Sequence, residues 1–358
     1  MRDFSEAPML VIWELTQACD LACRHCRASA RPGRDEAELS TQEAYAMLER
    51  VVEFGNNPLL VLTGGDPLKR PDLFNIIQRS VALGLRTTVT PSATPLLTHA
   101  AVARFKDCGV SRMAVSLDGA TKAAHDGFRG VDGSFARTLA ALRSAARVGL
   151  ETQINTTVTR HNMDSLAELA AIVGREKARL WSVFFLVITG RASASDDLTA
   201  GEYEHVFDFL YRTSLTAPYD IKTTEAPHYR RYHAQQRKQA GASVAPAVPG
   251  VSAIQRHAGI NDGKGLVFVS HTGEIFPSGF LELSAGNVRT TNLAAAYRQS
   301  GLFRVIRDAN RLEGKCGACD YRHLCGGSRS RAFALTGRPM AADPRCIYEP
   351  PLVLETAC

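Results

Sequence analysis

The chain has 358 residues, of which 45% are hydrophobic and 22% are charged, and its formal net charge is +6. This composition is ordinary for a globular protein with a sizeable core, and it excludes disordered and fibrous classes. The positive charge favours an anionic substrate over nucleic acid, because no run of Lys and Arg with interleaved aromatic residues is present. We find neither the apolar core of a signal peptide nor the roughly 18 apolar residues of a membrane span, so we expect a cytoplasmic protein without membrane or nucleic-acid partners.

The first motif is a run of three cysteines, Cys19, Cys23 and Cys26, directly after the apolar segment 10–15. Nine cysteines in a cytosolic chain favour metal binding over disulfides, because that compartment is reducing. Iron–sulfur clusters usually have four thiolate ligands, so three local cysteines leave one iron open to a small chelating ligand. A zinc site or plain structural cysteines are the alternatives, but no His or Cys follows at zinc-finger distance.

Strands and helices alternate after this run. A capping box at 40–43 opens a helix, and an apolar strand at 59–62 ends in a Thr-Gly-Gly-Asp-Pro stretch. The pattern predicts further strands at 85–90, 112–117, 152–158 and 180–188, and helices at 71–83, 98–106, 134–148 and 163–173. Six such strand–helix units predict an α/β fold, a parallel sheet curled into a partial (β/α)6 barrel with its active site at the C-terminal strand ends.

The periodicity changes after a last amphipathic helix at 199–215. Residues 216–265 are interpreted as a connector, whose stretch at 241–252 is rich in Gly, Ala and Pro and is predicted to be flexible or lid-like. Residues 266–276 predict a β-hairpin that opens a smaller domain. We therefore expect a barrel at 1–215, a connector at 216–265 and a C-terminal domain at 266–358.

The C-terminal part carries a second set of cysteines, Cys316, Cys319, Cys325 and Cys346. Four cysteines complete a closed site, and taken alone this spacing suits tetrahedral zinc as well as an iron–sulfur cluster. Because a three-cysteine run precedes it in the same chain, we interpret the second set as an iron–sulfur site.

A basic segment lies between the barrel and this second set. It contains Lys222, His228, Arg230 and Arg231, and its position after the last barrel helix predicts that it faces the barrel mouth. Such cations suit a carboxylate or phosphate, since arginine pairs with planar anions. The alternative is a solvated basic loop. No residue stands out as a catalytic acid or base.

The ordered motifs resemble those of radical S-adenosylmethionine enzymes with a C-terminal SPASM/twitch domain, over nearly the whole chain. The resemblance implies that the first three cysteines hold a 4Fe–4S cluster, whose open iron binds S-adenosylmethionine for reductive cleavage to a 5'-deoxyadenosyl radical. An electron donor such as flavodoxin or ferredoxin is implied as partner. The residues that match the cofactor-binding motifs are Gly64, Gly65, Asp66, Ser116, Asp118 and Arg129, with Ser92 and Asn155 as further strand-end positions that are either cofactor contacts or local hydrogen-bonding groups.

The C-terminal cysteines match the four ligands of the family's outer auxiliary 4Fe–4S cluster. Ser278 stands where the hairpin often carries a cysteine, so two clusters are predicted and not three. Residues 325–332 and 343–346 resemble the haem and haem d1 assembly branch, and cytosylglucuronate decarboxylase is a related possibility. This likeness implies a biosynthetic enzyme that abstracts hydrogen from an anionic small molecule and decarboxylates a porphyrin propionate or a nucleoside uronate. The alternative is modification or crosslinking of a ribosomal peptide.

Overall fold

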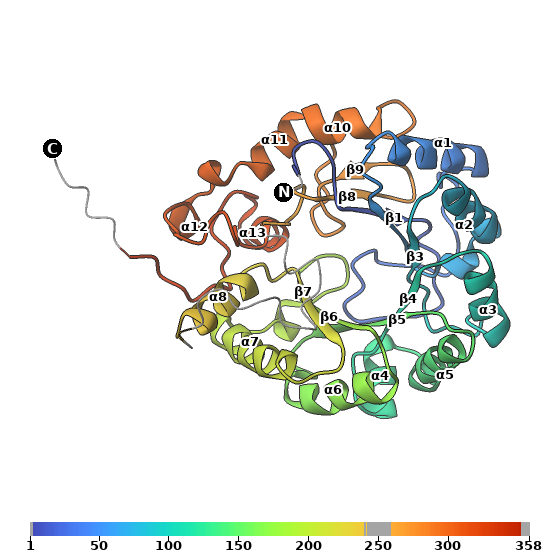
Figure 1. Ribbon diagram of the computed structural model, residues 1–358, viewed down its shortest axis with the longest axis horizontal. Coiled ribbons are helices and arrows are strands. Elements are labelled where there is room, and N and C mark those ends of the chain that lie inside the picture. Colours follow the sequence, from blue (N-terminus) through green and yellow to red (C-terminus); the bar gives the residue numbers. More distant parts are fainter. Residues whose placement is uncertain (1–2, 240, 242–258, 352–358) are drawn as a thin grey trace.

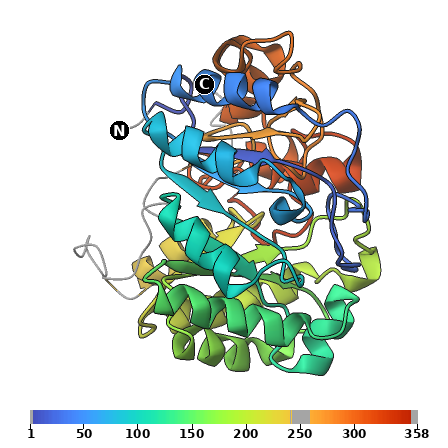
Figure 2. The same cartoon turned by 90° about the vertical axis from the view of Figure 1, so that its right-hand side faces the viewer.

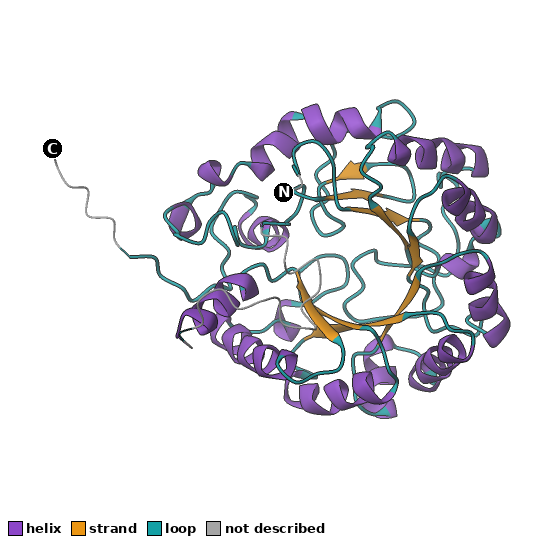
Figure 3. Cartoon of the chain, viewed as in Figure 1, coloured by secondary structure: helices purple, strands orange, loops and turns teal. Residues whose placement is uncertain are grey.

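The computed structural model describes residues 3–239, 241 and 259–351. Within these residues, nine strands form one sheet in the order β7-β6-β5-β4-β3-β2-β1-β8-β9. The strands are β1 (Leu10–Glu14), β2 (Leu59–Thr63), β3 (Thr87–Val89), β4 (Arg112–Ser116), β5 (Thr152–Val158), β6 (Leu180–Phe185), β7 (Asp220–Thr224), β8 (Leu266–Val269) and β9 (Ile275–Phe276). Neighbouring strands are parallel except for the hairpin of β8 and β9. The sheet curves around a central space (Figures 1 and 3), which confirms the partial barrel.

Most helices lie on the convex side of this sheet, as Figure 2 shows for the N-terminal half of the chain, whereas the last two lie at the open side of the barrel (Figure 1). The helices are α1 (Thr41–Val52), α2 (Leu73–Ala82), α3 (His99–Asp107), α4 (Lys122–Arg129), α5 (Ser134–Arg147), α6 (Leu166–Arg175), α7 (Ala200–Ser214), α8 (Tyr229–Gln239), α10 (Leu293–Gln299), α11 (Gly301–Arg307), α12 (Gly314–Gly317) and α13 (Arg329–Thr336). The predicted capping box is present at α1, where the Ser40 and Glu43 side chains bond each other's backbone N–H groups.

Successive residues of each strand point alternately to the apolar core and to the concave side of the sheet. Trp13, Ile154 and Trp181 point outward and belong to the large apolar cluster between strands and helices. Their strand neighbours point the other way, because successive side chains of a strand alternate between its faces. Asn155 and Lys222 are among these inward residues, so the concave side is lined partly by polar groups. The barrel therefore has an apolar outer core and an inner surface suited to a polar ligand.

The structure adds elements that the sequence did not predict. β7 and α8 lie within 216–239, where the sequence pattern predicted a connector. The pattern did not indicate β7, because Ile221 is the one residue of this strand that is fully buried. Residues 122–129 form α4, a helix that the sequence pattern did not predict. β8 is hydrogen-bonded in parallel to β1, so the hairpin continues the barrel sheet. The division into three parts stays a prediction, and residues 242–252 of the predicted flexible stretch lie outside the described residues. No helix in the described ranges combines the length and apolar character needed to cross a bilayer.

Candidate active site and cysteine clusters

The first three cysteines lie in the segment that follows β1, here called the cysteine loop (residues 15–31), and each of their sulfurs accepts a hydrogen bond. Backbone N–H groups donate to Cys19 Sγ and Cys26 Sγ, in both cases at 3.4 Å. The Arg129 guanidinium donates to Cys23 Sγ at 3.5 Å. Burial raises the pKa of Cys19, so its thiolate needs a bound cation to stay ionised. The three cysteines belong to one packed cluster of residues, and the hydrogen-bond donors at their sulfurs fit an iron–sulfur cluster.

The glycine motif after β2 packs against the backbone at the start of the cysteine loop. The Gly65 N–H donates to the Thr16 carbonyl at 2.7 Å, and the Asp66 N–H donates to the Ala18 carbonyl at 2.7 Å. A Cβ atom at Gly64 would lie 2.4 Å from the Thr16 oxygen, and one at Gly65 would lie 2.5 Å from the Ala18 oxygen. Only glycine permits this approach. The motif therefore fixes the position of the loop just before its first cysteine.

The predicted cofactor residues Asp66 and Ser92 lie beside Cys19. The Asp66 carboxylate is buried and accepts the Thr94 hydroxyl at 2.7 Å, and burial raises its pKa. The Ser92 hydroxyl donates to the Gly65 carbonyl at 2.7 Å, and its oxygen lies 3.6 Å from Cys19 Sγ. Both residues are thus grouped with the first cysteine at the C-terminal ends of β2 and β3.

A buried ion pair joins the second cysteine to the end of β4. Arg129, the last residue of α4, pairs with the carboxylate of Asp118, which also accepts the Thr157 N–H at 2.8 Å. Burial would raise the pKa of Asp118, but the Arg129 charge, together with smaller contributions from His25, His125 and the Thr157 N–H, outweighs burial and lowers it. Within the described residues, the Nε of Arg129 has no hydrogen-bond partner. An anion beside Cys23 would therefore find an N–H donor that is already in position.

Sequence reasoning missed a clamp on the other side of the cysteine loop. Gly190, after β6, has φ of +60°, and a Cβ there would lie 2.2 Å from the Cys26 carbonyl oxygen. The Arg191 N–H donates to that same carbonyl at 3.0 Å, while its guanidinium donates to the carbonyls of Cys23 at 2.9 Å and Ala30 at 2.8 Å. The Thr189-Gly190 pair after the predicted strand 180–188 was the only signal of this clamp in the sequence.

The residue after the third cysteine ties the loop to the C-terminal hairpin. Arg27 pairs with the buried Glu14 at the end of β1, and it donates to the Gly279 carbonyl at 3.1 Å. Glu14 also contacts His271 Nδ1 at 2.8 Å, and the Arg27 guanidinium stacks 4.8 Å above the Phe268 ring. These long-range contacts carry no local signal in the sequence.

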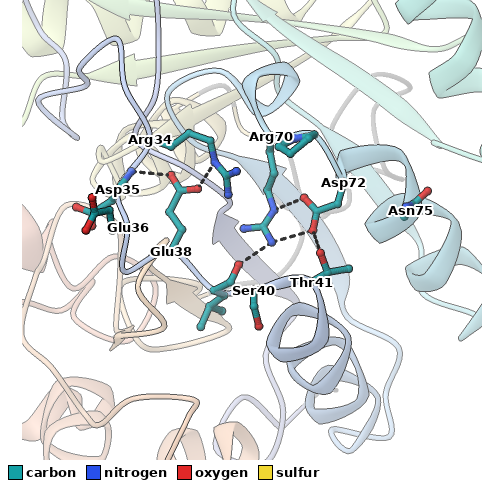
Figure 4. Close-up of a pocket in the computed structure, with 11 residues that line it drawn as sticks. Arg34, Asp35, Glu36, Glu38, Ser40, Thr41, Arg70, Asp72 and Asn75 are labelled. Atoms are coloured by element: carbon teal, nitrogen blue, oxygen red, sulfur yellow. Dashed lines mark hydrogen bonds and ion pairs between the residues drawn. The ribbon is translucent and has the colours of Figure 1, made fainter.

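A surface pocket of about 640 Å³ lies behind the start of the cysteine loop (Figure 4). Two ion pairs stand in its wall, Arg34 with Glu38 and Arg70 with Asp72. The buried Arg70 donates to the Leu15 carbonyl at 3.2 Å and to the Leu39 carbonyl at 2.7 Å, and it pairs with Asp72 at 2.7 Å. The pocket wall therefore holds the backbone at residue 15 in place, where the cysteine loop leaves β1.

The remaining predicted cofactor residues lie in one row across the concave side of the sheet. Ser116 is paired in register with Asn155, Asn155 with Ser182, and Ser182 with Lys222. Burial, followed by the nearby charge of Arg112, lowers the pKa of Lys222 to about 8. In the described ranges the Lys222 ammonium has no hydrogen bond or ion pair. The row thus ends in an unpaired cation inside the barrel.

The four C-terminal cysteines line one cavity, here called the four-cysteine cavity. Backbone N–H groups donate to the sulfurs of Cys316, Cys319 and Cys325 at 3.3 to 3.4 Å. Burial raises the pKa of Cys325 to about 12, so ionised sulfur there also needs a bound cation. Throughout the described residues, no three Cys, His, Asp or Glu side chains are close enough to hold one metal ion. The donor set fits a cluster of several irons, whose ligands stand further apart.

The predicted basic segment does not form one surface. Lys222 faces the concave side of the sheet, whereas His228 and Arg231 line the four-cysteine cavity. Arg231 is ion-paired with Glu204, and Arg230 donates to the Leu324 carbonyl at 3.4 Å. The expected single surface is split because α8 begins at Tyr229 and carries the later residues toward the C-terminal cysteines.

Comparisons with known proteins agree with this arrangement. The family model described as Radical SAM superfamily matches residues 13–173. The AdoMet-dependent heme synthase of Oleidesulfovibrio alaskensis is 41% identical over 98% of this chain and 90% of that protein. The protein of the same name from Methanosarcina barkeri is 38% identical over 97% and 98%. The solved structure of Streptococcus suis SuiB bound to S-adenosylmethionine shares the fold, with a TM-score of 0.75, 17% identity, and coverage of 96% of this chain and 78% of that one. This chain therefore belongs to the radical SAM superfamily of enzymes.

Proposed function

We propose that this enzyme acts on an iron porphyrin that carries propionate side chains and removes carboxylate groups from them. Two relatives that are 41% and 38% identical over nearly the whole chain carry the name AdoMet-dependent heme synthase. The observation in this chain that supports the proposal best is the unpaired Lys222 ammonium on the concave side of the barrel. A carboxylate-bearing substrate would supply the missing counter-charge.

As a radical SAM enzyme, the chain uses S-adenosylmethionine and a 4Fe–4S cluster, which together supply a carbon-centred radical able to abstract hydrogen. We assign the cluster to Cys19, Cys23 and Cys26. Arg129 would receive an anionic group of S-adenosylmethionine through its free N–H, next to Cys23. The strand-end residues assigned to the rest of the cofactor are Gly64, Gly65, Asp66, Ser92, Ser116, Asp118 and Asn155.

The roles of the protein side chains follow from their positions. Asn155 and Ser182 would orient the substrate by hydrogen bonds, while Lys222 in the same row would bind a carboxylate. With a pKa of about 8, Lys222 is mostly protonated at neutral pH and so carries the charge that this pairing needs. Because burial weakens its solvation, an ion pair formed there is stronger than one at the surface.

A propionate that becomes a vinyl group loses one hydrogen atom, one molecule of carbon dioxide and one electron. The C–C bond to the carboxylate breaks. One of its two electrons pairs with the unpaired electron left by hydrogen abstraction to form the new double bond, and the other is the surplus electron. Cys316, Cys319, Cys325 and Cys346 would hold a second cluster, which supplies one-electron transfer.

The direct test uses anaerobically reconstituted, dithionite-reduced enzyme with S-adenosylmethionine and iron coproporphyrin, a porphyrin with four propionates. We expect 5'-deoxyadenosine and carbon dioxide to form in equal amounts, with vinyl groups in the product by mass spectrometry. Deoxyadenosine without carbon dioxide would contradict the proposal. Turnover of a peptide in place of the porphyrin would favour the alternative of peptide modification.

Lys222→Met tests the substrate contact separately. We expect the KM for the porphyrin to rise about tenfold or more, since a hydrogen bond to a charged group is worth about 1.5–3 kcal/mol. Lys222→Arg should recover most of the affinity, and Lys106→Met is the control because Lys106 lies in α3, on the convex side. An unchanged KM in Lys222→Met would remove Lys222 from the substrate site.

A further inference from the structure

His228 is a buried imidazole that aromatic rings hold in place. Its side chain is 0% exposed. The ring stacks on Tyr203 with centroids 5.5 Å apart and an interplanar angle of 17°, and the Phe207 ring contacts it edge-on at 4.8 Å. These two rings come from α7, so the orientation of the imidazole does not depend on the cysteines themselves.

Neither ring nitrogen of His228 has a hydrogen-bond partner within the described residues. The Asp343 carboxylate lies 3.7 Å from Nδ1, which is beyond hydrogen-bond distance. That same carboxylate oxygen already accepts the Arg331 guanidinium at 3.2 Å and the Ser328 N–H at 2.8 Å. A buried N–H without an acceptor destabilises the folded protein, so an acceptor that is not a protein side chain must complete this site.

The four-cysteine cavity supplies the place for that acceptor, because His228 is part of its lining. A neutral imidazole carries one N–H, and iron–sulfur sulfides and thiolates accept hydrogen bonds. Two cations on the same wall are already engaged, since Arg231 pairs with Glu204 and Lys315 with Glu349. We propose that the His228 N–H donates a hydrogen bond to the auxiliary cluster in this cavity and thereby raises its reduction potential.

The physical reason is the extra negative charge of the reduced cluster. A donor aimed at a sulfur stabilises the reduced state more than the oxidised state, so the potential rises. His228 acts here as a positioning and tuning residue and not as a substrate contact. This inference rests on the assignment of the four C-terminal cysteines as ligands, and it does not depend on the identity of the substrate.

The test uses the full chain with Cys19, Cys23 and Cys26 changed to Ala, so that only the auxiliary cluster is present after reconstitution. The midpoint potential is measured by a redox titration followed by electron paramagnetic resonance. We expect His228→Phe to shift the potential to more negative values at unchanged iron content. Tyr203→Phe is the matched control, because it keeps the stacked ring and removes only a hydroxyl that bonds Leu186 and Asp197. It should leave the potential unchanged.

A second measurement is made first on the protein that keeps His228. Pulsed electron paramagnetic resonance on the reduced cluster of protein grown with 15N-histidine should show a hyperfine coupling to a histidine nitrogen, which His228→Phe removes. If His228→Phe does not assemble its cluster, this coupling in the parent still decides the question. Absence of the coupling, or an equal potential in His228→Phe, would overturn the proposal and leave a buried water as the partner of the ring.

Discussion

The two cysteine regions are built in different ways. The cysteine loop is fixed by backbone contacts from several separate strand ends. Glycines at 65 and 190 allow the segments after β2 and β6 to approach the loop backbone within hydrogen-bond distance. The four-cysteine cavity is assembled from short turns and α12, and three of its four cysteines are only half-buried. The cysteine loop would hold its cluster opposite a cofactor inside the barrel, which requires a fixed position. The cluster proposed for the four-cysteine cavity would transfer electrons, which requires stable ligation and a suitable reduction potential.

Removing one cysteine from each region should separate their roles most clearly. Cys23→Ala should abolish reductive cleavage of S-adenosylmethionine and lower the iron content from about eight to about four per chain. Cys319→Ala should lose a similar amount of iron but keep most of the cleavage measured without substrate. The measurements are iron per chain and 5'-deoxyadenosine formed under reducing conditions. Cleavage by Cys23→Ala would contradict the ligand assignment, and full iron content in Cys319→Ala would contradict the second cluster.

A milder change tests whether the cysteine loop depends on its backbone clamp. In Gly190→Ala the new Cβ would meet the Cys26 carbonyl at 2.2 Å, on a backbone with φ of +60°. The loop must shift, and we expect cleavage of S-adenosylmethionine to fall about tenfold or more, since such strain costs about 1–3 kcal/mol.

The matched control for this change is Gly201→Ala. Gly201 lies in α7, and a Cβ there would meet nothing within 4 Å. This variant should cleave S-adenosylmethionine at the parent rate, with equal or slightly higher thermal stability. Equal rates in both variants would show that Gly190 does not hold the loop.

Much of the barrel follows from local sequence signals. Apolar strands such as β2 and helices opened by a capping box such as α1 were predicted close to their observed bounds. β7 was missed because its alternate residues face the polar concave side, which leaves Ile221 as its one fully buried residue. Its place in the sheet is set by pairing with β6, a contact that only the folded chain brings about.

The candidate site was predictable where its residues fall in one ordered motif. The cysteines and the glycines at 64 and 65 are of this kind. The arginines that hold the cysteine loop in place were not predictable. Arg191, Arg70 and Arg27 form hydrogen bonds with groups that are distant in the sequence. The separation of Lys222 from His228 also depends on where α8 begins, and the basic segment alone does not indicate that boundary.

One carboxyl group near each cysteine region has a shifted pKa, and the two shifts have opposite directions. Asp118, beside the cysteine loop, has a lowered pKa, because the Arg129 charge and smaller contributions such as the Thr157 hydrogen bond together outweigh its burial. Glu225 follows β7 and accepts the Ser328 hydroxyl at 2.6 Å, on the side of the C-terminal cysteines. Burial, followed by the neighbouring charge of Asp262, raises the pKa of Glu225 to about 8. Glu225 is therefore protonated in the folded protein at neutral pH, whereas in the unfolded chain it is ionised above about pH 4.5.

This difference has a defined effect on stability. Between about pH 4.5 and 8 the folded state binds one more proton at Glu225 than the unfolded state, so the free energy of unfolding falls as pH rises, by about 1.4 kcal/mol per unit at most. Glu225→Gln keeps an uncharged side chain and removes this dependence. We expect the variant to lose less stability than the parent between pH 6 and 8 in denaturant unfolding of the reconstituted protein. Parallel pH profiles would mean that Glu225 is ionised in the folded chain, with Arg331 and the two hydroxyls of Ser278 and Ser328 stabilising its charge.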